Sequence, residues 1–321
     1  SVEKQQKLMP VDQNLNLKQC LSMRSAIIEK LVCKVKPDLV ITEHFPFGPL
    51  FETEVISLIT QVKKNNLQSK IVSCVRDVIL TEEGSARDSH VCSLINKWYD
   101  LILVHGDPNI VPFKSSFPMV EKIQIPFHYT GYIVQSIEQR RSQSNWPILL
   151  VSVGGGRMGG ELLDAVLKAH ETIARQWQHQ LVLFIGAFQK DKQRLHEYVK
   201  QNNLYNVKIH QFDKEHYHRI LAEASAVICM GGYNSLLEAV SIEKPVLIYN
   251  RLFHGNNQEQ KLRMVRFQQE GLIRIINSDE LDREKLADLV LDALKNFRDI
   301  RFNVKIDGVF ETLKILKGFF H

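Results

Sequence analysis

The chain has 321 residues, of which 44% are hydrophobic and 24% charged, a balance that excludes a disordered protein and a length that suits two domains. Its formal net charge of +5 is too small, and the basic residues are too scattered, to indicate nucleic-acid binding. No apolar run reaches the roughly 18 residues of a membrane span, and the five cysteines form no C-x-x-C pair, which favours reduced core thiols in a cytoplasmic protein.

The first 130 residues alternate helical and strand patterns. We expect helices over residues 17–35, 51–65 and 86–97, and strands over residues 38–43, 70–75 and 101–104. Strands that alternate with helices through short loops indicate a parallel, doubly wound sheet, so the fold class is α/β.

Polar side chains follow each of these strands. Ligands bind at the carboxyl ends of parallel strands, which would place Glu43 and His44, Arg76-Asp77, and His105 at one crevice. A carboxylate or imidazole there could deprotonate a hydroxyl, so Glu43, His44 and His105 are the candidate catalytic residues. Two alternatives stay open: Arg76 and Asp77 pair only to hold a loop, and the His105 ring bonds the backbone of a turn.

A glycine-rich segment follows a polar connector. Residues 131–146 lack an apolar period and are expected to be a linker. A buried strand is then expected over residues 148–153, followed by Gly154-Gly155-Gly156-Arg157 and a helix over residues 161–177. Backbone N–H groups of such a loop suit a phosphate, and Arg157 would add a cation; the alternative is an exposed turn. The spacing matches neither the P-loop nor a clean dinucleotide fingerprint.

Further strands are expected over residues 181–185 and 207–212, with helices over residues 190–201 and 215–224. Phe212 is a candidate for contact with a nucleotide base, with core packing as its alternative. His210, His216 and His218 do not have the H-E-x-x-H spacing, and the last two face different sides of a helix, so no metal site is expected.

The most informative stretch lies near residue 230. Val227 to Met230 predict a buried strand, Gly231-Gly232 end it, and Ser235 occupies the expected N-cap of a helix that runs to residue 241. A glycine pair at a helix N-terminus suits an anion, and the acceptor-only carboxylate of Glu238 suits the two hydroxyls of a ribose. The alternative is that Ser235 and Glu238 form a capping box and only cap the helix.

These residues carry a resemblance to a known family. The segment MGGYNS-LLEA, the strand before Arg251, and Glu259-Gln260 followed by an apolar helix that ends in Gly-Leu together resemble the nucleotide-sugar half of GT-B glycosyltransferases. The closest resemblance is to the peptidoglycan N-acetylglucosaminyltransferase group, with its family 28 C-terminal domain, and to a related branch of predicted bacterial glycosyltransferases. That group has two glutamines where this chain has Glu259-Gln260, so the resemblance does not fix N-acetylglucosamine as the donor sugar.

The resemblance implies roles for residues. The diphosphate would lie at the two glycine-rich segments with Arg157 or Arg251, the ribose on Glu238, and the sugar at Glu259-Gln260. The implied donor-binding residues are Gly154, Gly155, Gly156, Arg157, Phe212, Met230, Gly231, Gly232, Asn234, Ser235, Glu238, Arg251, Glu259 and Gln260. His254 would be a further contact of the sugar.

The resemblance also implies two Rossmann-like, doubly wound domains. Residues 1–130 would form the acceptor side and residues 147–300 the nucleotide-sugar domain, with a helix in residues 301–321 that packs across both. Residues 1–37 contain no glycine or histidine, whereas the family opens with a glycine-rich loop, so we expect the first domain to lack its opening βαβ units. The alternative for the last helix is contact with the inner membrane surface.

The implied reaction is transfer of a sugar from a nucleotide-diphosphate sugar, most simply a UDP-sugar, to the hydroxyl of an unidentified acceptor, with inversion. No D-x-D occurs, so neither a metal nor another cofactor is expected. The alternatives are a nucleotide-sugar hydrolase or 2-epimerase on the same scaffold, and a non-catalytic module that binds the nucleotide sugar.

Overall fold

The computed structural model describes residues 9–12, 14–48, 51–79, 86–138, 145–189, 192–251, 258–297 and 303–320. The chain divides into two compact units, the first built from Ser1–Pro108 and Pro112–Thr130, and the second from Asn109–Val111 and Gly131–His321. His254 lies outside the described residues.

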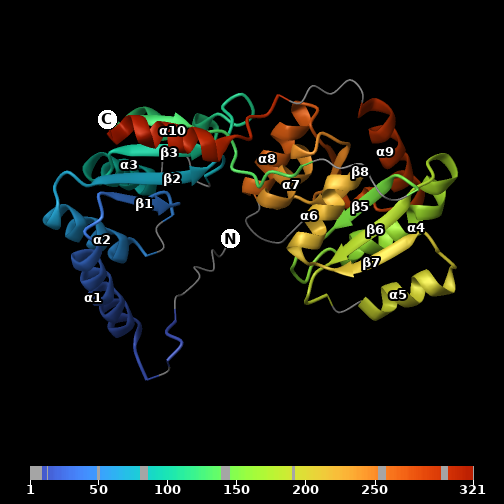
Figure 1. Ribbon diagram of the computed structural model, residues 1–321, viewed down its shortest axis with the longest axis horizontal. Coiled ribbons are helices and arrows are strands. Elements are labelled where there is room, and N and C mark those ends of the chain that lie inside the picture. Colours follow the sequence, from blue (N-terminus) through green and yellow to red (C-terminus); the bar gives the residue numbers. More distant parts are fainter. Residues whose placement is uncertain are drawn as a thin grey trace. The chain divides into compact units, whose positions relative to one another are not determined.

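The first unit is built on a parallel sheet with the strand order β1-β2-β3-β4 (Figure 1). Its elements are α1 (Leu17–Val35), β1 (Leu39–Glu43), α2 (Glu52–Asn65), β2 (Lys70–Arg76), α3 (Ala86–Trp98), β3 (Leu101–His105), the 3₁₀ helices η1 (Phe113–Ser115) and η2 (Pro118–Lys122), and β4 (Phe127–Tyr129). The helices and strands expected in this half are confirmed. The sequence pattern does not indicate β4, because three residues are too few to show a period.

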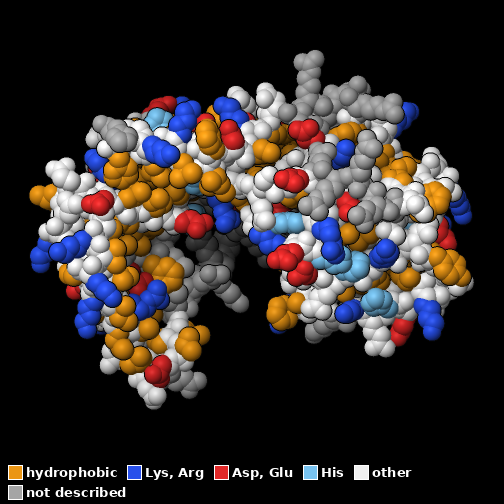
Figure 2. Space-filling model, in the orientation of Figure 1, with side chains coloured by type: hydrophobic (Ala, Val, Ile, Leu, Met, Phe, Trp, Pro, Cys, Tyr) orange, Lys and Arg blue, Asp and Glu red, His pale blue; other side chains and the backbone are white. Residues whose placement is uncertain are grey.

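The first helix shows how closely local signals set its ends. Asn16 and Gln19 form a capping box at the start of α1, and Lys36 adopts a left-handed conformation with φ 49° just before Pro37. Within α1 only Val32 is buried. Met23, Ile27 and Leu31 recur at four-residue spacing and are exposed, and Figure 2 shows hydrophobic side chains on the surface in the region of α1.

The second unit is a six-stranded parallel sheet with the order β10-β9-β8-β5-β6-β7. Its elements are β5 (Ile148–Ser152), α4 (Gly160–Gln176), β6 (Gln180–Ile185), α5 (Lys192–Gln201), β7 (Val207–Gln211), α6 (Lys214–Glu223), β8 (Ala224–Met230), α7 (Tyr233–Ser241), β9 (Val246–Tyr249), α8 (Gln258–Gln269), β10 (Arg274–Ile276), η3 (Ser278–Glu280), α9 (Arg283–Asn296) and α10 (Gly308–Phe320). The strand order reverses between β5 and β8, which are neighbours although β6 and β7 separate them in sequence. In such sheets this reversal opens a crevice for ligands.

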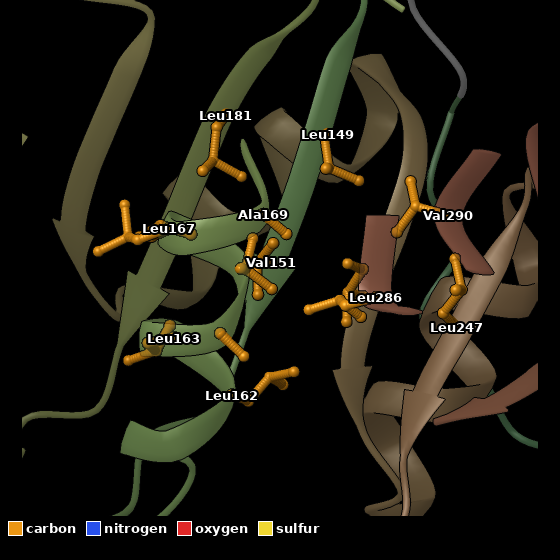
Figure 3. Packing of buried hydrophobic residues seen from close by; sticks show 14 of the residues in the cluster. Leu149, Val151, Leu162, Leu163, Leu167, Ala169, Leu181, Leu247, Leu286 and Val290 are labelled. Carbon is orange, nitrogen blue, oxygen red and sulfur yellow. The ribbon is translucent and has the colours of Figure 1, made fainter. Parts of the chain in front are cut away.

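Side-chain alternation along the strands separates the two faces of this sheet. Ala226 and Ile228 of β8 belong to a core in which leucines of α4 and α9 pack together against the sheet (Figure 3). On the other face, Sγ of Cys229 lies 3.7 Å from the backbone oxygen of Ser235 in α7. The sheet is therefore covered on both sides, as its uninterrupted apolar strands require.

The last helix, α10, exposes Val309, Phe310 and Leu313, whose exposed fractions are 54%, 66% and 53%. Its flank carries Lys314, which pairs with Glu311 at 3.3 Å. Packing across the two domains and contact with a membrane surface both stay predictions for this helix. In the part of the chain that the structure describes, no helix has both the length and the apolar character needed to cross a bilayer.

Candidate functional site

A cavity of about 450 Å³ lies at the carboxyl ends of the strands where the order of the second sheet reverses. Ser152 of β5 pairs in register with Cys229 of β8, so the loops that follow these two strands lie next to each other. The cavity is lined by Val153, Gly154, Gly156, Arg157, Met158, Met230, Gly231, Gly232, Ser235, Tyr249, Asn250, Arg251, Gln258, Gln260, Lys261 and Met264. The fold thus brings together nine of the fourteen predicted donor-binding residues.

The helix behind the glycine pair begins earlier than the sequence predicts. Gly232 is the N-cap of α7, with φ −65° and ψ 141°, and no side chain caps the helix. Ser235 is therefore the third helical residue, and the expected capping box of Ser235 and Glu238 is wrong. The reason is that Gly232 adopts the extended cap conformation itself, so the chain enters the helix directly at Tyr233. The N–H groups of the first turn, which have no intrahelical partner, consequently start next to the cavity.

Close backbone packing explains two glycines around the first loop. A Cβ on Gly186, just after β6, would lie 1.9 Å from the backbone oxygen of Gly156. Gly159 has φ 91°, and a Cβ there would lie 2.5 Å from Cγ1 of Val153. Any larger side chain at either position would displace the loop that lines the cavity.

The cavity is lined by three cations, Arg157, Arg251 and Lys261, and none of its described lining residues is acidic. The guanidinium of Arg157 stacks 5.5 Å from the ring centroid of Phe188. Nε of Arg251 lies 2.6 Å from Oε1 of Glu161, in the first turn of α4. This lining favours an anionic ligand, and the helix N-terminus adds to the same field.

The two residues at the start of α8 lie differently. Gln260 lines the cavity, whereas Oε1 of Glu259 lies 2.6 Å from Nη2 of Arg263. Arg263 is fully buried, and its guanidinium also lies 4.8 Å from the ring centroid of Tyr233. The pair thus ties the first turn of α8 to the residue that follows the glycine pair.

Glu238 lies one turn deeper in α7 and is not part of the cavity lining. Its Oε1 lies 3.1 Å from Nε2 of His218 on α6. Burial, with a contribution from Glu238, raises the pKa of the Cys229 thiol to about 12 and also raises the pKa of Tyr217. The carboxylate therefore faces α6 and β8, beside a buried phenol and thiol.

Three further predicted donor residues flank the cavity without lining it. A Cβ on Gly155 would lie 3.8 Å from Cδ1 of Phe212, so the aromatic ring sits beside the first glycine-rich loop. Phe212 also packs against Tyr217 at a ring distance of 5.4 Å. Asn234 is exposed in the first turn of α7.

In the first unit, the predicted catalytic residues follow adjacent strands. Oε1 of Glu43 lies 3.6 Å from Nη2 of Arg76, so Arg76 pairs with a carboxylate of the neighbouring strand, while Asp77 is fully buried. His44 is exposed and has φ 67°.

The third predicted catalytic residue, His105, is partly buried at the end of β3. Nδ1 of His105 lies 2.8 Å from Oγ1 of Thr130, so its ring meets a side-chain hydroxyl. Burial lowers the pKa of His105. The imidazole is thereby kept neutral near pH 7, and a neutral ring is able to accept a proton.

Metal ligands do not gather in this chain's described ranges. His210 and His216 meet edge to face, with ring centroids 4.4 Å apart. No group of three or more His, Cys, Asp or Glu side chains with metal-binding geometry occurs among the described residues.

Residues 150–305 match the family model described as Glycosyltransferase family 28 C-terminal domain. No curated protein sequence matches the chain significantly.

Solved structures extend the likeness to both units. The chain is similar to the crystal structure of Acinetobacter baumannii MurG, with a TM-score of 0.58 and 12% identity over 93% of this chain and 78% of that chain. It is also similar to the crystal structure of CalG4, the calicheamicin glycosyltransferase, with a TM-score of 0.56 and 17% identity over 98% of this chain and 79% of that chain. A third similar structure is UDP-GlcNAc 2-epimerase from Methanocaldococcus jannaschii, with a TM-score of 0.57 and 12% identity over 95% of this chain and 83% of that chain. At these identities the likeness shows the fold: two parallel-sheet, Rossmann-like units of the GT-B type.

The sequence patterns do not indicate two of the residues that line the cavity. Lys261 and Gln258 flank the predicted Glu259-Gln260 pair, but the sequence places the start of the helix at residue 261, whereas α8 begins at Gln258. A start at Gln258 puts Lys261 in the first turn, on the cavity. A signal for Lys261 was available, since it is the one cation directly after the pair.

Proposed function

We propose that the chain is a glycosyltransferase that moves a sugar from a nucleotide-diphosphate sugar, most simply a UDP-sugar, to an acceptor hydroxyl, with inversion and without a metal. The observation that carries the proposal is the cavity at the reversal of the second sheet, where a glycine pair and a helix N-terminus meet Arg157, Arg251 and Lys261. This combination suits a diphosphate, because each part stabilises negative charge.

The same charges would act on the leaving group. The acceptor oxygen attacks the anomeric carbon, the bond from that carbon to the diphosphate oxygen breaks, and the diphosphate departs with the electron pair. The N-terminus of α7 and the three cations stabilise the charge that develops on it. A single displacement of this kind inverts the anomeric configuration.

The acceptor proton passes to a base, for which Glu43, His44 and His105 of the first unit are the candidates. Of these, His105 has the strongest support, because burial lowers the pKa of its ring and so keeps the ring ready to accept a proton near pH 7. His105 is partly buried, whereas Glu43 and His44 are exposed.

A second candidate is a 2-epimerase or hydrolase that uses the same donor cavity. The likeness to UDP-GlcNAc 2-epimerase from Methanocaldococcus jannaschii favours it as the alternative. In that case rearrangement, or attack by water, would replace the acceptor, and the cations of the cavity would keep their role.

The test is incubation with UDP-glucose, UDP-galactose and UDP-N-acetylglucosamine, with and without alkyl glycosides as acceptors, followed by chromatography of nucleotide and sugar. We expect UDP release that depends on the acceptor, and a large loss of release in His105→Gln. Free sugar without acceptor would instead assign a hydrolase, and a C2 epimer a 2-epimerase. UDP binding without any product would assign a binding module.

A further inference from the structure

Glu238 and His218 meet between two helices of the second unit, away from the lining of the cavity. Nε2 of His218 on α6 lies 3.1 Å from Oε1 of Glu238 on α7. The two side chains are only 13% and 14% exposed, so water does little to weaken their contact.

The second carboxylate oxygen of Glu238, Oε2, is available to a ligand. In the described part of the chain, no hydrogen bond and no second ion pair reaches the carboxylate of Glu238, so Oε2 keeps its capacity to accept hydrogen bonds. Tyr217, next to His218 on α6, is 2% exposed, and among the described residues its hydroxyl has no hydrogen-bond partner. A buried hydroxyl and a half-engaged carboxylate thus lie in one polar cluster, which a native protein usually satisfies with a ligand or water.

We propose that His218 is a positioning residue that holds the carboxylate of Glu238 in the orientation needed to bind the ribose hydroxyls of the donor. The inference rests on the proposed function, because it assumes that a nucleotide occupies the neighbouring cavity. Glu238 has three rotatable side-chain bonds, and freezing them on binding would cost free energy. A contact that fixes one oxygen before the ligand arrives removes part of that cost and leaves the other oxygen for the ligand.

The pairing has a consequence for specificity. An ionised carboxylate only accepts hydrogen bonds, so two vicinal hydroxyls match it, whereas a 2′-deoxyribose offers one. The protein should therefore distinguish ribonucleotides from 2′-deoxyribonucleotides, and His218 should be necessary for that distinction.

Calorimetric titration of the full chain tests this, with uridine and guanosine diphosphate and the 2′-deoxy form of each as probes. The variants are His218→Ala, His218→Gln and the matched control His216→Gln, which changes a histidine on the same helix that packs against Phe184 instead. Urea unfolding of each variant checks that the fold is retained.

We expect the wild type to prefer one ribonucleotide over its 2′-deoxy form by about tenfold, the worth of a hydrogen bond to a charged group. His218→Ala should lose most of this preference, because it weakens binding of the ribonucleotide more than binding of the 2′-deoxy form. His218→Gln, whose amide reaches the same position, should restore it, and His216→Gln should keep it.

Three results would overturn the proposal. If His218→Ala weakens both forms equally, its role is structural, and if it changes neither, His218 does not act on Glu238. In both of these cases the nucleotide still binds, so the proposed function survives. If the wild type binds none of the probes, the proposed function falls and this inference falls with it.

Discussion

Nε of Arg251 lies 2.6 Å from Oε1 of Glu161, so a carboxylate from the first turn of α4 holds one of the three cations of the cavity. The hydroxyl of Tyr249 lies 3.4 Å from the same oxygen. Glu161 is not among the lining residues, yet it sets how much of the charge of Arg251 an anionic ligand meets.

Glu161→Gln should therefore tighten binding of uridine diphosphate. The pair is about one-third exposed, so the gain is modest, about 1 kcal/mol or roughly fivefold in Kd. The matched control is Asp164→Asn, also on α4, which breaks the ion pair with Arg194 of α5 and should leave Kd unchanged. Weaker binding in Glu161→Gln would mean that the pair orients Arg251 rather than neutralising it.

Gly186→Ala should destabilise the second unit by about 1–3 kcal/mol, because a Cβ there would lie 1.9 Å from the backbone oxygen of Gly156. Gly156→Ala is the control, since a Cβ on Gly156 meets nothing within 4 Å, and it should change stability by less than about 0.5 kcal/mol. Urea denaturation measures both. Equal stability of the two variants would contradict the close packing of these loops.

Glu259→Gln should destabilise the chain by about 2 kcal/mol, because it removes the carboxylate that lies 2.6 Å from the fully buried Arg263. The loss stays below that of a wholly buried pair because the side chain of Glu259 is 34% exposed. Gln260→Ala, one residue on, should leave the unfolding midpoint unchanged and weaken binding of the donor sugar. If Glu259→Gln is as stable as the wild type, the pair does not brace α8.

A buried histidine pair at the other end of the second sheet predicts acid sensitivity. His179 donates from Nδ1 to the backbone oxygen of Trp177 at 2.7 Å, which leaves Nε2 to accept from Nδ1 of His170 at 3.1 Å when both rings are neutral. Burial, with a contribution from His179, lowers the pKa of His170 to about 4.

The unfolded chain binds a proton at this residue near pH 6.5, whereas the folded chain binds it only near pH 4, so stability falls as the pH falls between these values. We expect a loss of about 2 kcal/mol between pH 7.5 and pH 5 from this residue. His170→Leu should remove most of it, as shown by urea midpoints at the two pH values. An unchanged pH dependence in the variant would contradict the prediction.

Sequence patterns predict most of the fold because strong local signals coincide with the elements. The helix at Leu17–Val35 has an N-cap and a proline stop, and Gly271, with φ 72°, follows α8 where the sequence pattern ends the helix in Gly-Leu. The short strand β4 is not predicted from the sequence, because its three residues owe their strand conformation to pairing with β3.

Part of the site could also be predicted from strong local sequence signals. The glycine-rich segments follow clear strands, so their meeting at one cavity follows from the parallel sheet. The partners of charged side chains were not predictable, because Glu161 and Arg251, or His218 and Glu238, are distant in sequence and meet only through packing. The misplaced start of α7 arose because Gly232 takes the cap position that Ser235 would occupy on pattern alone.

The most direct test of the account is calorimetric titration of the full chain with uridine, uridine monophosphate and uridine diphosphate, repeated for Arg157→Gln. We predict that the diphosphate binds most tightly, that uridine alone binds at least about tenfold more weakly, and that Arg157→Gln reduces the advantage of the diphosphate. Equal affinity for uridine and its diphosphate, or no binding of either, would contradict the assignment of the cavity to a nucleotide diphosphate.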